Sequence, residues 1–223
     1  MAAGGDHAAT DTRRALEELI QAYWFPLYAF VRRQGEAPAG AEDMVQEFFA
    51  HLLEKKFIAQ VDRSKGKFRS FLLAAVKHFL SKERDKLRAQ KRGGGQAVIA
   101  LDALDAEARY AVEPADDMTP ERLFDRRWAL AVLDQVLARL SAEYAQSGKA
   151  RLYGAIEPCL TGGAGALDYA HLSRELRMTE GAVRVAVHRL RRRYRDVLRE
   201  EIAQTLDSPG QVEEEISYLL KCL

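Results

Sequence analysis

The chain has 223 residues, of which 48% are hydrophobic and 30% charged, and its formal net charge at pH 7 is +1. This length suits one or two domains of ordinary size. The apolar runs fall far short of the roughly 20 residues that a membrane-spanning helix needs, and the first residues contain no apolar signal-peptide core. The two cysteines are too few for a disulfide framework and lack the spacing of metal ligands. We therefore expect a cytoplasmic protein that has no membrane partner, no metal and no other cofactor.

Positive and negative charges lie in separate blocks along the chain. Residues 63–92 hold eleven lysines and arginines against two acids. Residues 184–195, RVAVHRLRRRYR, hold six arginines and no acid, whereas acids dominate residues 102–125 and 200–223. Two separate basic segments indicate two separate contacts with a polyanion such as nucleic acid.

Helical periodicity dominates the first half of the chain. Apolar residues recur at helical spacing over 16–31, where Pro26 lacks an N–H and is expected to break or kink the helix. The same spacing predicts helices over 41–56 and about 68–90. The helix over 68–90 begins apolar and ends in the almost wholly charged SKERDKLRAQKR. These elements predict a helical domain over residues 12–95.

The acidic segment 96–119 is short of large aromatic residues, so we expect a flexible linker there. Helical periodicity returns at Pro120 and predicts a second helical domain over residues 120–206. Residues 207–223 form an extension with one short amphipathic helix. We expect this helix to pack on the second domain or to bind a partner, and packing within the chain is the simpler alternative.

Two helices predicted over 168–177 and 180–200 meet at Thr179, which suits an N-cap. On the second of them an apolar stripe consists of Val183, Val187, Leu190, Tyr194 and Val197. A basic stripe about 100° away consists of Arg184, His188, Arg191, Arg192 and Arg195. A merely solvated face would carry acids as well. The pattern therefore predicts a helix-turn-helix whose second helix enters the major groove of DNA. The fold class is all-α, with two small helical domains and a C-terminal helix.

On the helix predicted over 41–56, Asp43, Gln46 and Glu47 share a polar face. Paired carboxylates can serve acid–base catalysis or bind a metal. No third ligand follows at a suitable spacing, so we expect this face to meet water or a protein partner. The helix over 68–90 interleaves cations with aromatic rings, a combination that suits single-stranded nucleic acid, although most of its phenylalanines are expected in the core.

Taken in order, three segments resemble a bacterial sigma factor. They are AEDMVQEFFAHLLE at 41–54, GKFRSFLLAAVKHFLSKERDKLRAQKR at 66–92 and HLSRELRMTEGAVRVAVHRLRRRYRDVL at 171–198. The two-domain layout and small size resemble the extracytoplasmic-function group. The chain departs from the family pattern at His78, where many relatives have Asn, and in the order of charges over 82–85. These departures leave the base preference at the minus-ten element open.

The resemblance implies a role for each segment. It implies that core RNA polymerase is bound by Asp43, Gln46 and Glu47. It implies that the melted minus-ten element is bound by Lys77, His78, Lys82, Arg84, Lys86 and Arg88. It implies that the minus-thirty-five element is bound as a duplex by Thr179, Arg184, His188, Arg189, Arg191, Arg192 and Arg195. An anti-sigma factor or another regulator is a further partner that the resemblance allows.

We therefore expect a sigma factor that binds core RNA polymerase, directs it to promoters and assists promoter opening in transcription initiation. Such a protein is not an enzyme, because bond formation belongs to the polymerase. Two alternatives stay open. A stand-alone helix-turn-helix transcriptional regulator would use residues 179–195 without binding core polymerase. A nucleic-acid-processing enzyme would need carboxylates that converge on a metal, and the acids here are scattered.

Overall fold

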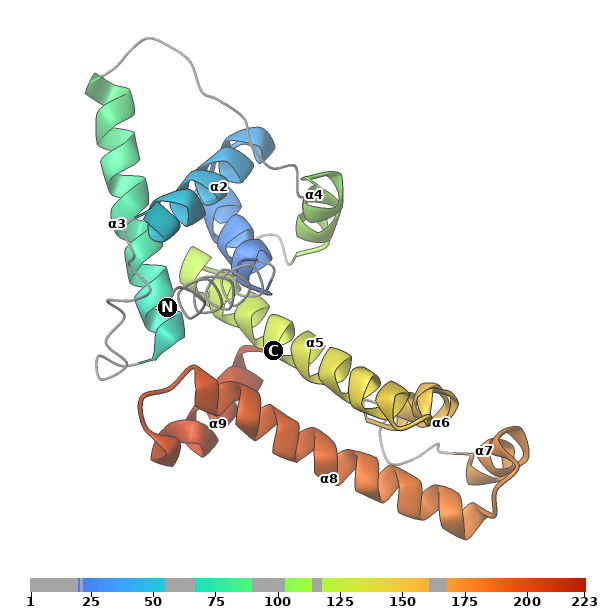
Figure 1. Cartoon of the computed structure of the whole chain (residues 1–223). Coiled ribbons are helices and arrows are strands. Elements are labelled where there is room, and N and C mark those ends of the chain that lie inside the picture. Colours follow the sequence, from blue (N-terminus) through green and yellow to red (C-terminus); the bar gives the residue numbers. More distant parts are fainter. Residues whose placement is uncertain (1–19, 21, 55–66, 90–102, 114–117, 161–167) are drawn as a thin grey trace, which may run out of the picture. The chain divides into compact units, whose positions relative to one another are not determined.

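The computed structural model describes residues 20, 22–54, 67–89, 103–113, 118–160 and 168–223. Every regular element in these residues is a helix, as the sequence predicts (Figure 1). The α-helices are α2 (Pro38–Glu54), α3 (Phe68–Ala89), α4 (Ala103–Ala111), α5 (Pro120–Gln146), α6 (Ala150–Ile156), α7 (Tyr169–Leu176), α8 (Glu180–Gln204) and α9 (Val212–Cys222). Short 3-10 helices lie at η3 (Glu157–Cys159) and η4 (Pro209–Gln211). None of the helices described is long and apolar enough to cross a membrane.

The helices belong to two compact units. The first consists of Met1–Ala131 together with Thr205–Leu223, and the second of Val132–Gln204. These limits differ from the predicted second domain, which began at residue 120 and ended at 206. The helix α5 passes from the first unit into the second, and the chain returns to the first unit after α8.

Residues 22–33 form a deeply buried helix of the first unit. The side chains of Leu27, Phe30 and Val31 have no exposed surface. The chain stays helical through Pro26, so the predicted break does not occur. A proline removes one backbone hydrogen bond, and burial of the large apolar side chains around it offsets that loss.

Three further helices complete the core of the first unit. Their large buried residues lie mostly three or four positions apart and include Val45, Phe48 and Leu52 of α2, Leu72, Val76 and Leu80 of α3, and Leu123, Phe124 and Trp128 of α5. The rings of Tyr23 and Trp128 stack with their centroids 3.8 Å apart. Burying one such side chain contributes roughly 1.5–3 kcal/mol, and this burial holds the first turns of α5 in the first unit.

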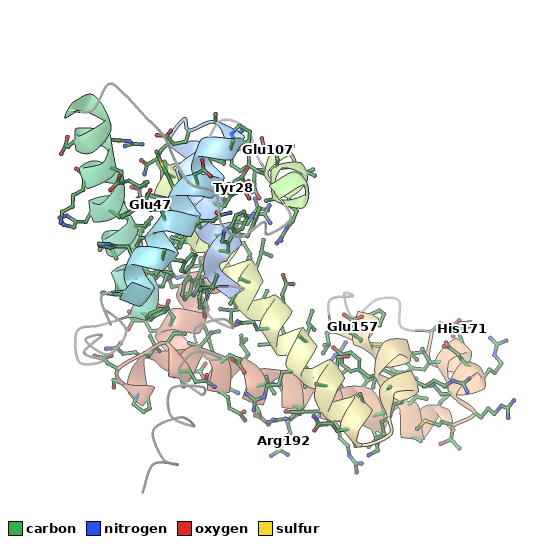
Figure 2. The ribbon with its side chains drawn as sticks, turned by 45° about the horizontal axis from the view of Figure 1, so that its top comes forward. Tyr28, Glu47, Glu107, Glu157, His171 and Arg192 are labelled. Atoms are coloured by element: carbon green, nitrogen blue, oxygen red, sulfur yellow. The ribbon has the colours of Figure 1, made fainter. Side chains whose placement is uncertain are left out.

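The helix α4 lies in the segment 96–119, where the sequence predicted a flexible linker. Glu107 of α4 binds two residues of the helix 22–33 (Figure 2). Tyr28 donates its hydroxyl to Glu107 at 2.6 Å, and Arg32 donates two N–H bonds to the same carboxylate at 2.7 and 2.9 Å. The bond from Arg32 lowers the pKa of Glu107. The acidic composition of the segment 96–119 indicated a chain exposed to solvent, but Glu107 has specific partners in the fold.

The C-terminal helix α9 forms as predicted, but it packs on the first unit instead of the second. Val212 and Leu219 are buried. Glu215 is only 2% exposed; it forms an ion pair with Lys67 Nζ at 2.7 Å and accepts a hydrogen bond from Arg69 Nε at 3.1 Å. The N-terminal end of α3 is therefore one of the surfaces that hold α9.

The second unit has a core of its own, built on α5 and α8. Its buried residues are Val136, Leu140, Tyr153, Ile156, Cys159, Val183, Val187, Leu190 and Val197. The end of α5 runs antiparallel to α8, since Arg139 pairs with Glu201 at 2.8 Å and Glu143 pairs with Arg193 at 2.6 Å. The short helices α6 and α7 contact each other, and α7 packs on α8 (Figure 1).

Candidate nucleic-acid interface

The junction between α7 and α8 is closed by backbone hydrogen bonds. Asp168 caps the start of α7 by accepting the N–H of His171 at 2.8 Å. At the other end, the N–H of Arg177 bonds to the carbonyl of Arg174, and the N–H of Met178 bonds to the carbonyl of Ser173 at 3.0 Å. This pair of bonds is the Schellman pattern that ends a helix. Arg177 adopts a φ of 54°, the left-handed conformation that this pattern needs.

Thr179 begins α8, as the sequence predicts. Its Oγ1 accepts the N–H of Ala182 at 3.2 Å, and its carbonyl accepts the N–H of Val183 at 3.0 Å. A threonine cap contributes about 1 kcal/mol to helix stability. The direction and starting point of α8 are therefore set within three residues of the turn.

The predicted apolar stripe orients α8 in the second unit. Val183, Val187, Leu190 and Val197 are buried, and Tyr194 is partly buried against the same core. At 3.6 residues per turn, these positions occupy one side of the helix. The opposite side of α8 faces outward from the unit.

The outward side of α8 is cationic. His188, Arg189, Arg192 and Arg195 are exposed, and Figure 2 shows Arg192 projecting from the helix. None of these four has an ion-pair partner within the described part of the chain. No acid occurs between Gly181 and Arg195. These side chains can therefore bind an anion without first breaking a salt bridge.

Two other arginines of α8 bind groups inside the unit. Arg191, which belongs to the predicted DNA-binding set, donates to the carbonyl of Cys159 at 2.9 and 3.3 Å. Arg193 donates to Glu143 at 2.6 and 2.9 Å and to Glu200 at 2.9 Å. The bond from Arg193 lowers the pKa of Glu143. The arginines of this segment therefore have two roles. Arg191 and Arg193 attach α8 to the rest of the unit, and the exposed ones form an outward cationic surface.

Arg184 lies near the start of α8 and stacks on α7. Its guanidinium carbon is 4.1 Å from the centroid of the Tyr169 ring, and its Nη2 is 3.9 Å from Oε2 of Glu180. Tyr169 is itself partly buried against the core. A cation held over an aromatic face loses part of its conformational freedom before it meets a ligand.

Two residues of this surface were missed by the sequence-based prediction. Tyr169 was not among the predicted binding residues, because its contact with Arg184 depends on how α7 crosses α8. Val185 is 49% exposed on the outward side of α8. The exposure of Val185 could have been predicted from the sequence, because helical periodicity places this apolar residue opposite the buried stripe.

The predicted minus-ten residues lie on α3. His78 and Lys82 are exposed. Lys77 forms an ion pair with Glu121 at 2.7 Å, and Arg84 contacts Glu36 at 3.4 Å. The last two members of the set, Lys86 and Arg88, lie in α3, but their side chains are outside the described part of the structure.

The helices α2 and α3 border a cavity of about 410 Å³. Phe48, Phe71 and Phe79 contribute apolar surface to it, and Glu47 and Lys82 contribute charges. The cavity therefore brings a residue of the predicted polymerase-binding face close to the predicted minus-ten residues.

The predicted polymerase-binding face lies on α2. Asp43 and Glu47 are exposed, and Gln46 is partly exposed and donates to Glu42 at 3.1 Å. In the part of the chain that the structure describes, no group of three or more His, Cys, Asp or Glu side chains could hold a metal ion. No protein-family model, curated protein or solved structure matches the chain significantly.

Proposed function

We propose that this protein is a sigma factor that binds core RNA polymerase, directs it to promoters and assists promoter opening. The observation that carries the proposal is the outward side of α8, with exposed basic side chains at His188, Arg189, Arg192 and Arg195 and no acid among them. A short helix, a closed turn and an anchored basic helix form a helix-turn-helix, which places its second helix in the major groove. In this role the second unit binds the minus-thirty-five element as a duplex.

The first unit supplies the other contacts in this proposal. The exposed His78 and Lys82 of α3 bind the melted minus-ten element, with Phe71 and Phe79 lining the adjacent cavity. Asp43 and Glu47 on α2 bind core polymerase through their exposed carboxylates. A duplex contact and a single-strand contact on separate units fit the two basic blocks of the sequence.

Promoter-dependent transcription tests the proposal. The purified chain, mixed with core RNA polymerase and genomic DNA fragments, is expected to give transcripts with defined start sites. The double variant Asp43→Asn/Glu47→Gln is expected to lose core polymerase binding by at least tenfold in a pull-down assay. The control Glu213→Gln/Glu214→Gln removes two exposed acids of α9 and is expected to bind like the wild type. A chain that never binds core polymerase contradicts the proposal.

A stand-alone transcriptional regulator is a second candidate. It is favoured by the ion pairs of Lys77 and Arg84, because they engage two of the cations among the described side chains of α3. In that case Asp43→Asn/Glu47→Gln changes neither DNA affinity nor activity in cells. Under both candidates Arg192→Gln weakens duplex binding and lowers the slope of log affinity against log salt by about 1, the value for one lost phosphate contact.

A further inference from the structure

Val185 is an apolar side chain at the centre of the cationic outward side of α8. It is 49% exposed. His188, Arg189 and Arg192 follow it by three, four and seven residues, so all four share one side of the helix. Among the described residues of the second unit, Val185 is the one large hydrophobic side chain with this degree of exposure.

The fold does not account for valine at this position. β-Branched residues form helices less well than alanine, lysine or arginine, and an exposed valine buries little apolar surface. Gly181, one turn earlier on the same side, is also unexplained by packing, because a Cβ atom added there would meet no atom within 4 Å. Together the two residues make a low, apolar patch surrounded by cations.

The ligand chemistry follows from this combination. The surrounding cations match the phosphates on both sides of a DNA groove. The 5-methyl group of thymine is the apolar group that base edges present in the major groove. The missing side chain at Gly181 lets the helix backbone approach the bases closely.

We propose that Val185 determines sequence specificity by contacting the 5-methyl group of one thymine in the duplex bound by α8. This inference rests on the proposed binding of duplex DNA by the second unit. It assigns recognition of one base to an apolar contact, and it leaves the outward arginines as phosphate ligands that do not distinguish sequences.

A chemical double-mutant cycle tests the contact. The probe is the duplex that the full chain, alone and bound to core RNA polymerase, enriches most strongly from a random-sequence pool. Each thymine in it is replaced singly by uracil, which removes only the 5-methyl group. One replacement is expected to weaken wild-type binding about fourfold, the factor that corresponds to one buried methyl group. Val185→Ala is expected to weaken binding of the thymine duplex by a similar factor and to abolish the preference for thymine over uracil.

Two further variants separate this contact from a general effect. Val185→Thr keeps one methyl group and is expected to retain part of the thymine preference. Arg195→Gln is expected to weaken binding to thymine and uracil duplexes equally and to reduce the salt dependence. All these substitutions are on the exposed side of α8, and unchanged thermal unfolding confirms that each variant is folded.

The outcomes distinguish failure of this inference from failure of the proposed function. The role of Val185 is overturned if the enriched duplex contains no thymine, or if the preference for thymine survives Val185→Ala. In either case, duplex binding itself still supports the proposed function. A chain that enriches no duplex, alone or with core polymerase, overturns the proposed function and this inference together.

Discussion

The two units hold their helices together with ion pairs that differ in burial. In the first unit Arg69, Asp125 and Glu215 are 7%, 7% and 2% exposed, and Arg69 binds both acids. In the second unit, the side chains of Arg193 and Glu143 are each about a third exposed. One network joins α3, α5 and α9 inside a core, and the other joins α5 and α8 at a surface.

The difference determines what each network contributes. Removing one member of a buried network leaves an uncompensated charge in a medium of low dielectric, which costs several kcal/mol. Exposed pairs are solvated with or without their partners, and each contributes little. We infer that the buried network specifies where α9 docks, whereas the exposed network aligns α8 with α5.

The largest effect is expected for Arg69→Met in the buried network. Methionine matches the length of the arginine stem but leaves Asp125 and Glu215 without this cation, so the free energy of unfolding should fall by about 3–5 kcal/mol. Both tryptophans of the chain, Trp24 and Trp128, belong to the first unit. Urea unfolding followed by tryptophan fluorescence therefore measures the unit in which the change is made.

Replacing the whole buried network provides the control. The triple variant Arg69→Met/Asp125→Leu/Glu215→Leu removes the three buried charges together and leaves the partly exposed Lys67, so it should recover most of the stability that the single variant loses. If Arg69→Met alone costs less than about 1 kcal/mol, the network behaves like an exposed one and the comparison fails.

Tyr218→Phe is expected to have an intermediate effect in the same network. Tyr218 donates its hydroxyl to Asp125, and this bond, with burial, raises the pKa of Tyr218 to about 12. Because the folded pKa lies above the usual value of 10.0, the contribution to stability is complete below pH 10 and is lost as the pH rises from 10 toward 12.

The Tyr218→Phe variant should lose about 1.5 kcal/mol at neutral pH, the usual contribution of a hydrogen bond to a charged acceptor. Its stability should also fall less than that of the wild type as the pH rises above 10, because it has no Tyr218 hydroxyl to ionise. Urea midpoints between pH 8 and 11.5, compared with those of the wild type, measure both effects. A constant difference between the two proteins over this range would contradict the assigned hydrogen bond.

Features that depend on neighbours in the sequence were predictable. The stripe of Val183, Val187 and Leu190 and the cap at Thr179 are confirmed, because a helix period and a cap involve residues within one or two turns. The break expected at Pro26 does not occur, because the local cost of the proline was weighed without the burial of the residues beside it.

Long-range partners were not predictable from composition. Glu107 binds Arg32 from 75 positions away, and Arg69 binds Glu215 across 146 positions. An acidic segment looks the same in sequence whether its carboxylates meet water or a specific arginine. The helix α4 and the surface on which α9 packs therefore appeared only in the structure, as did the internal contacts of Arg191 and Arg193.

The smallest effect is expected for Arg193→Gln in the exposed network. The loss should be about 0.2–1 kcal/mol per ion pair, and it should shrink in 1 M salt, which screens exposed charges.

Glu143 has a lowered pKa, so its contribution to stability is present above the usual 4.5 and is lost as the pH falls through the folded value. Hydrogen exchange of α8 amides at pH 7 and pH 4 measures this dependence, which Arg193→Gln should weaken. Arg192→Gln is the matched control on the outward side, and it should change neither exchange nor its pH dependence while weakening duplex binding. If Arg193→Gln weakens duplex binding as much as Arg192→Gln and leaves exchange unchanged, Arg193 acts on the ligand and the division between internal and outward arginines is wrong.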